Sequence, residues 1–71
     1  MERIPVQSSN IASIGYSTES STLEVEFLNG SVYQYFGVPK DVFDSLMNSS
    51  SKGSFLDHNV KKAGYSYCRI S

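Results

Sequence analysis

Apolar and polar side chains alternate along residues 22–28 and again along residues 31–36, and Asn29-Gly30 stands between the two runs. A period of two is typical of a β-strand with one buried face. Asn-Gly favours a two-residue type I′ turn, because both central residues of that turn need positive φ. The pattern therefore predicts an antiparallel hairpin at the centre of the chain.

A two-residue turn fixes the register of this hairpin, with Leu28 opposite Ser31 and Glu24 opposite Tyr35. In that register one face is apolar and turns to the core, with Gln34 as its polar member. The other face sets carboxylates beside phenols. The predicted core face holds Leu23, Val25, Phe27, Val32 and Phe36, and the predicted opposite face holds Glu24, Glu26, Tyr33 and Tyr35.

Further segments have the character of strands. Residues 11–17 alternate and extend the hairpin into an antiparallel meander. Residues 3–9 form an edge strand or an extended lead-in, because Pro5 cannot donate a hydrogen bond to a ladder. Residues 65–70 alternate again, and we expect them to pair with the edge left by the meander.

Two segments have helical periodicity. Residues 39–48 predict the main helix, and Pro39 suits its first position. Residues 54–62 predict a shorter helix, with Ser54 as its N-cap and Gly64 beyond its end. The apolar stripe of the main helix consists of Val42, Phe43, Leu46 and Met47.

Together these elements predict an α+β fold that forms a single domain over residues 1–71. An antiparallel sheet of about four strands packs on the main helix and the short helix. Its strands are residues 11–17, 22–28, 31–36 and 65–70. The predicted core consists of Ile14, Leu23, Val25, Phe27, Val32, Phe36, Val42, Phe43, Leu46, Phe55, Val60 and Ile70.

The composition limits the class of protein. A chain of 71 residues forms at most a small core, and 39% hydrophobic residues are enough for it to fold. No apolar run approaches the ~20 residues that span a membrane, and the first residues lack the apolar segment of a signal peptide. The single cysteine, Cys68, excludes an internal disulfide framework, and we expect a small buried thiol. These features favour a cytoplasmic protein.

The charge is divided unevenly along the chain. The net charge of −1 argues against strong nonspecific binding of nucleic acid. Residues 1–38 hold four glutamates and one arginine, a sum of −3, whereas residues 39–71 hold five basic and three acidic residues, a sum of +2. The second half could therefore form a basic side.

Several short segments follow one another in a familiar order. They are Val6-Gln-Ser-Ser-Asn-Ile11, Gly15-Tyr16, Leu23-Glu-Val-Glu-Phe-Leu-Asn-Gly30, Val32-Tyr-Gln-Tyr35, Val38-Pro39 and Ser51-Lys-Gly53. In this order they resemble the KTSC domain, which occurs at the C-terminus of some lysyl-tRNA synthetases and as a stand-alone small bacterial protein. The resemblance covers residues 6–69 and departs at Asp57, where asparagine is expected. It implies a small domain with RNA as the suggested ligand, and it carries over no aminoacylation activity.

The central tyrosines have two interpretations. Exposed, Tyr33 and Tyr35 could stack on the bases of a single-stranded nucleic acid. If they pack under a neighbouring segment, they serve only to stabilise the fold, and this is the interpretation we favour. The candidate nucleic-acid contacts are Tyr33, Tyr35, Lys52, Lys61, Lys62 and Arg69.

A second candidate is a serine-rich loop before the predicted short helix. Backbone N–H groups at a helix start, with a lysine beside them, can bind an anion. The alternative, which we favour, is an ordinary connection, since the spacing of a phosphate-binding Walker loop is absent. The candidate loop consists of Ser51, Lys52, Gly53 and Ser54.

The leading hypothesis is a non-enzymatic binding module with RNA, tRNA included, as ligand and with no cofactor. The alternative is a protein-interaction module that pairs an open sheet edge with a partner strand or another copy of itself. An enzyme has the least support, because His58 is expected as a solvated helix residue, and Glu24 and Glu26 lie on a strand face without a cleft. One cysteine and one histidine fall short of the ligands of a structural zinc site, so no metal is expected.

Overall fold

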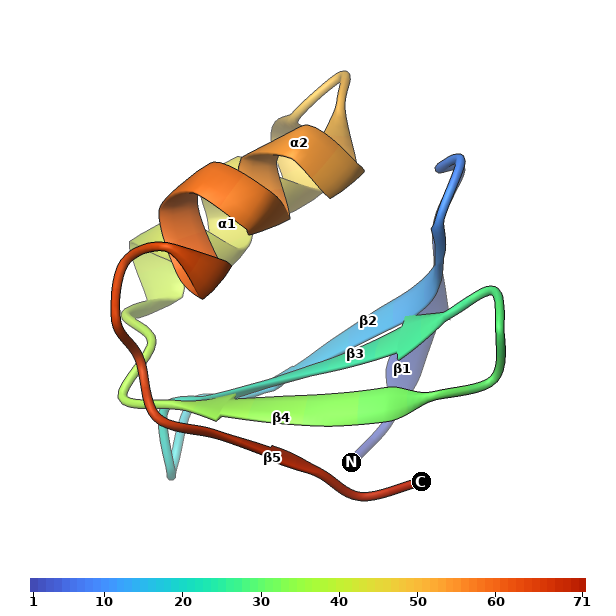
Figure 1. The fold of residues 1–71 in the computed structure, drawn as a ribbon. Helices are drawn as coiled ribbons and strands as arrows, with labels where there is room; N and C mark the ends of the chain where they lie inside the picture. The colour runs from blue at the N-terminus through green and yellow to red at the C-terminus, as the bar shows by residue number, and fades with distance from the viewer.

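The computed structural model describes all residues from 1 to 71 and shows an antiparallel sheet covered on one face by helices (Figure 1). The sheet has five strands in the order β1-β2-β3-β4-β5, so each strand pairs with its neighbours in sequence. The elements are β1 (Arg3–Pro5), β2 (Ile11–Ser17), β3 (Thr22–Phe27), β4 (Val32–Phe36), α1 (Lys40–Asn48), α2 (Lys52–Leu56), the π-helical segment η1 (Asp57–Lys61) and β5 (Tyr67–Arg69). The predicted α+β fold is confirmed.

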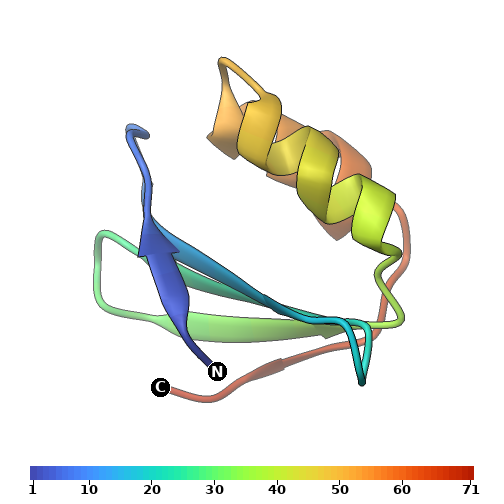
Figure 2. The same ribbon diagram turned by 180° about the vertical axis from the view of Figure 1, so that it is seen from behind.

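The helices form a layer of their own. Figures 1 and 2 show α1 beside the continuous helical segment of α2 and η1, with both on the same side of the sheet. The chain enters and leaves on the other side of the sheet, where both termini lie. The last strand pairs with β4, as predicted, and the N-terminal segment forms a regular edge strand. The short helix begins at Lys52 rather than at Ser54, and Ser51 is its N-cap.

The core lies between the sheet and the helix layer. Its fully buried side chains are Ile11, Ile14, Leu23, Val25, Val38, Leu46, Leu56 and Val60, and Tyr35 completes the cluster. The predicted members Phe27, Val42, Phe43 and Phe55 are partly buried against it. Two predicted members are wrong, because Phe36 and Ile70 are exposed. The helices cover only one face of the sheet. Phe36 follows the core-facing Tyr35 in β4 and so belongs to the other face, and Ile70 follows the end of the edge strand β5.

The register of the central hairpin differs from the prediction by one residue. The N–H of Phe27 donates to the carbonyl of Ser31, and the N–H of Gly30 donates back to the carbonyl of Phe27, each at 2.9 Å. The loop is therefore a three-residue connection over residues 28–30, and Gly30 takes a φ of +91° at its last position. A type I turn followed by a glycine with positive φ is the next most common hairpin loop after the two-residue turns.

This one-residue change reverses the two faces of β4, because side chains alternate along a strand. Tyr33 lies opposite Val25 and Tyr35 lies opposite Leu23, so both tyrosines face the helix layer. Gln34 lies opposite Glu24 and faces the other way. The predicted row of carboxylates beside the tyrosines is therefore wrong.

The face away from the helices carries a polar network instead. The carboxylate of Glu24 forms an ion pair with Arg3 and accepts a hydrogen bond from the Gln34 amide at 2.8 Å. Glu26 accepts a hydrogen bond from the hydroxyl of Ser13, also at 2.8 Å. These contacts tie the edge strand β1 to the middle of the sheet. Both glutamates therefore have a structural role in this face of the sheet.

The network has a consequence for stability in acid. Burial alone raises the pKa of Glu24, but the hydrogen bond from Gln34 and the bond and charge of Arg3 outweigh it and hold the pKa below its ordinary value. A carboxyl whose pKa is lower in the folded state stabilises the fold above its unfolded pKa, and this contribution disappears as the pH falls through the folded pKa. We therefore expect the free energy of unfolding to fall steeply below about pH 5.

Urea unfolding followed by circular dichroism between pH 7 and pH 3 checks this prediction. The variant Glu24→Gln should be less stable than the wild type at neutral pH and should lack most of the acid slope. Glu19→Gln, at an exposed loop position, is the matched control and should follow the wild type. An identical pH dependence in the wild type and in Glu24→Gln would contradict the role given to this carboxylate.

Candidate functional site

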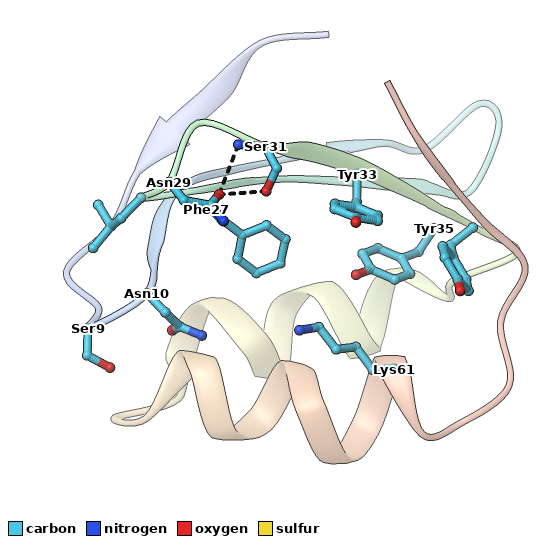
Figure 3. Close-up of a pocket in the computed structure, with 10 residues that line it drawn as sticks. Ser9, Asn10, Phe27, Asn29, Ser31, Tyr33, Tyr35 and Lys61 are labelled. Carbon is cyan, nitrogen blue, oxygen red and sulfur yellow. Dashed lines mark hydrogen bonds between the residues drawn. The ribbon is translucent and has the colours of Figure 1, made fainter. Parts of the chain in front are cut away.

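A cavity of about 680 Å³ lies between the helix layer and the β3–β4–β5 side of the sheet (Figure 3). Its volume is within the range of small-molecule binding pockets. The apolar half of its lining consists of Phe27, Leu28, Tyr33, Tyr35 and Tyr67, and the polar half consists of Ser9, Asn10, Asn29, Ser31 and Lys61. No carboxylate lines it.

The aromatic side chains of the cavity contact one another. The ring of Tyr33 stacks near that of Tyr35 with centroids 6.4 Å apart, and it meets the edge of Phe27 at 5.9 Å. Tyr67 lies 6.2 Å from Tyr33 and 6.0 Å from Tyr35. The strand pairing causes this gathering, because Tyr35 lies opposite Tyr67 and Tyr33 opposite Val25. The side chains form a continuous aromatic surface across three strands.

The exposure of the tyrosines changes along this surface. Tyr35 is 4% exposed, Tyr33 is partly buried, and Tyr67 is 66% exposed at the edge of the sheet. Burial, and then the neighbouring phenols of Tyr33 and Tyr67, raise the pKa of Tyr35 above its ordinary value. Tyr35 is therefore a neutral phenol at physiological pH. The aromatic surface is therefore anchored in the core at Tyr35 and exposed to solvent at Tyr67.

Lys61 is the cation of the cavity and comes from the helix layer. Its Nζ lies 4.9 Å from the centroid of the Phe27 ring, a cation–π contact (Figure 3). The π-helical segment η1 positions it: the N–H of Lys62 donates to the carbonyl of Asp57 at 3.1 Å, one residue further back than in an α-helix. Val60 is thereby buried in the core while Lys61 faces the sheet. Such π-turns occur frequently at functional sites.

The cavity brings together part of the predicted nucleic-acid contacts. Tyr33, Tyr35 and Lys61 line it. Arg69 lies opposite Tyr33 in the sheet, so it shares the tyrosine face, and its Nε donates to the carbonyl of Ser71 at 2.9 Å. Both tyrosines pack against the core, Tyr35 within the central cluster and Tyr33 partly buried beside it, and both also line the open cavity.

The remaining predicted contacts lie elsewhere. Lys62 is exposed, and its Nζ is 3.6 Å from the carboxylate of Asp57. Lys52 lines a separate polar hollow, and its Nζ donates to the carbonyl of Ser49 at 2.9 Å. That hollow has a volume of about 340 Å³ and is bounded by residues 7–10 and 50–54, so it contains the whole predicted anion-binding loop of Ser51, Lys52, Gly53 and Ser54.

The structure agrees with the prediction for His58 and contradicts the prediction for Cys68. His58 is exposed on the helical segment and its Nδ1 lies 2.9 Å from the carbonyl of Ser54, in agreement with a solvated helix residue. Cys68 is an exposed free thiol, so the predicted buried thiol is wrong. Cys68 lies opposite Gln34 on the face away from the helices, at the edge of the sheet. No group of three or more His, Cys, Asp and Glu side chains gathers anywhere in the structure.

Several site residues were missed in the sequence. The sequence pattern predicts Phe27 as a core residue alone and indicates no role for Asn10, Asn29 and Tyr67, although all four line the cavity. The signal for Tyr67 was present, because Tyr65, Tyr67 and Arg69 alternate in the last strand. It could not be used until the register of β4 placed Tyr33 and Tyr35 on the same side.

Fold and cavity together define a small α+β domain with an aromatic, ligand-sized cavity that carries one cation. None of its helices combines the length and the apolar character that crossing a membrane requires. The family model of the KTSC domain matches residues 7–67, and the chain belongs to this family. The resemblance found in the sequence is thereby confirmed.

Known relatives occur both as small proteins and as parts of larger ones. The crystal structure of a KTSC domain protein from Yersinia pestis is similar with a TM-score of 0.88 and 41% identity, over 99% of this chain and 97% of that one. An uncharacterized protein from Stutzerimonas stutzeri is 40% identical over 99% of both chains. A lysine–tRNA ligase from Nostoc punctiforme is 40% identical over 78% of this chain, but the match covers only 10% of the ligase.

Proposed function

We propose that this KTSC domain is a non-enzymatic module that binds single-stranded RNA in its aromatic cavity. The observation that carries the proposal is the joint presence of open tyrosine rings and Lys61 in a cavity without a carboxylate. Stacking on an aromatic ring contributes ~1–3 kcal/mol per base and suits unpaired bases. A match to part of a lysine–tRNA ligase supports RNA as the class of ligand.

Phosphate contacts complete the proposed interface. Lys61 inside the cavity and Arg69 beside Tyr33 are the cations nearest to the stacking surface. Ser9 and Asn10 line both the aromatic cavity and the polar hollow that contains Lys52, so the two hollows adjoin. We place the main phosphate contacts at Lys61 and Arg69, and outer contacts at Lys52 and Lys62. The loop over residues 51–54 would then meet the backbone of the RNA as it leaves the cavity.

Substitution of Lys61 tests this arrangement. We expect Lys61→Ala to weaken binding of a ten-nucleotide single-stranded RNA and to reduce the slope of log K against log salt by about 0.7, the value for one phosphate contact on a single strand. Fluorescence anisotropy between 50 and 200 mM salt measures both quantities. Lys40→Ala removes the same charge from α1, outside the cavity, and is the matched control. Equal affinities and slopes for the two variants would remove Lys61 from the interface.

A second candidate function is supported by the edge strand β5. The N–H of Phe36 donates to the carbonyl of Ser66, and the N–H of Ile70 donates to the carbonyl of Val32, each at 2.8 Å. Because antiparallel bonding alternates, the backbone groups of Tyr67 and Arg69 point away from β4 and are free for a partner strand. Sedimentation velocity over a wide concentration range and nuclease-treated pull-downs distinguish the two functions. A monomer that captures RNA supports the first; self-association or RNA-independent capture of a protein supports the second.

A further inference from the structure

The polar end of the cavity presents hydrogen-bond donors of defined direction. The side-chain oxygen of Asn29 accepts bonds from the backbone N–H of Ser31 at 3.0 Å and from its hydroxyl at 2.7 Å. A backbone N–H can only donate, so the atom that faces it must be the amide oxygen. The NH₂ group of Asn29 is therefore left on the other side, toward Phe27 and the cavity, as Figure 3 shows.

Hydrogen bonds also fix the orientation of the side-chain amide of Asn10. The hydroxyl oxygen of Ser8 accepts the backbone N–H groups of Asn10 and Ile11, each at 3.3 Å. Both of its lone pairs are occupied, so its proton goes to the side-chain oxygen of Asn10, 3.1 Å away. The NH₂ group of Asn10 is again the free group, and it lies on the cavity side in Figure 3.

Gly53 supports this position of Asn10. A Cβ atom at Gly53 would collide with the side-chain oxygen of Asn10, so the bare backbone at the start of α2 leaves room for the amide. The end of the cavity away from the tyrosines thus carries two amide donors with fixed direction, and Lys61 adds an ammonium donor between them and the rings. No carboxylate is present to accept from an amino group of a ligand.

From this set of donors we infer that the cavity selects nucleobases with a carbonyl oxygen at the position where cytosine and adenine carry an amino group. Uracil in particular is the base that we expect. This inference rests on the proposed function and deepens it. A uracil ring that stacks on Tyr33 offers a carbonyl oxygen to each of the two amide donors. Cytosine offers one carbonyl oxygen and turns its amino group toward the other donor, which is then left without an acceptor. A donor that the bound base shields from water without bonding to it costs affinity. Uracil and cytosine differ little in size, so the comparison isolates the hydrogen bonds.

Fluorescence anisotropy with ten-nucleotide oligo(U) and oligo(C) tests the inference. We expect the wild type to bind oligo(U) about tenfold more tightly, as one or two net hydrogen bonds would give. Asn29→Asp keeps an oxygen toward Ser31 and replaces the donor of the cavity by an acceptor, so the preference should disappear or reverse. Asn59→Asp adds the same charge on η1, outside the cavity lining, and should keep the preference. The ratio of the oligo(U) affinity to the oligo(C) affinity is compared between the two variants, because the added negative charge weakens both affinities and cancels in the ratio.

Equal binding of oligo(U) and oligo(C), or an unchanged ratio in Asn29→Asp, would overturn the inference while leaving the RNA-binding function in place. NMR titrations with uridine and cytidine monophosphates separate RNA from a free nucleotide as the source of the base. Preference for the uridine nucleotide without binding of either oligonucleotide would support the inference and overturn the proposed function. Absence of binding in every arm would overturn both.

Discussion

Replacing Tyr33 by alanine is expected to weaken binding of single-stranded RNA by about 1–3 kcal/mol, which corresponds to roughly 5- to 150-fold in affinity. The reason is the position of this ring at the centre of the aromatic surface, in contact with Phe27, Tyr35 and Tyr67. Its removal takes away the half-open stacking face and also the neighbour that orients the exposed ring of Tyr67. Isothermal titration with a ten-nucleotide oligo(U) measures the loss.

The control for this prediction is Tyr33→Phe, which keeps the ring and removes only the hydroxyl. We expect it to retain most of the affinity, because stacking needs the ring alone. Circular dichroism of both variants shows whether the fold is intact, since Tyr33 is also packed against the core. Wild-type affinity in a folded Tyr33→Ala variant would show that the base does not stack on this ring.

Replacing Leu46 by alanine is expected to lower the free energy of unfolding by about 2–5 kcal/mol. Leu46 is the single fully buried residue of α1 and joins that helix to the central cluster. A domain of 71 residues has a total stability of about 4–10 kcal/mol, so this loss leaves much of the population unfolded near body temperature. Urea unfolding at 25 °C and a thermal melt, both followed by circular dichroism, measure the change.

Met47→Ala is the matched control for this second prediction. Met47 follows Leu46 on the same helix but is only partly buried, so its truncation should cost clearly less. A loss below about 1 kcal/mol for Leu46→Ala would mean that the site collapses around the missing side chain or that α1 contributes little to the fold. Equal losses for the two variants would lead to the same conclusion about the helix layer.

The sequence pattern predicted the elements of this fold better than it predicted their register. Strands and helices follow from local periodicity, which the sequence contains in full. The register of the hairpin depends on the choice between a two-residue and a three-residue loop, and Asn29-Gly30 suits both. The side chain of Asn29 favours the longer loop by accepting two hydrogen bonds from Ser31. The pattern in residues 32–36 could not decide, because Gln34 is its only polar position.

The register also changes the electrostatic environment of the candidate site. With the shorter loop, Glu24 and Glu26 would lie beside the tyrosines and repel phosphates. In the structure both glutamates face the opposite side, where Arg3 and Ser13 hold them. The charges near the tyrosine face are then the cations Lys61 and Arg69. The repulsion of phosphates that the predicted register would cause is therefore absent from the tyrosine face.

The meeting of the site residues could not be predicted from local patterns. Tyr33 lies in β4, which precedes the helices in the sequence, and Tyr67 lies in β5, which follows them. Only the pairing of β4 with β5 brings the two residues together. Lys61 reaches the cavity because η1 has π-helical bonding, for which the sequence offers no reliable signal. The exposure of Cys68 follows from its place on an edge strand and on the face that the helices leave uncovered.

The most direct test of the central claim is a heteronuclear NMR titration of the ¹⁵N-labelled domain with oligo(U) at about 0.1 M salt, where phosphate contacts must be sensitive to salt. The account predicts salt-dependent shifts at Tyr33, Lys61, Tyr67 and the side-chain amide of Asn29, and none at Glu24 on the opposite face. Absence of shifts at the cavity residues, or shifts confined to the outer face of the sheet, would contradict it.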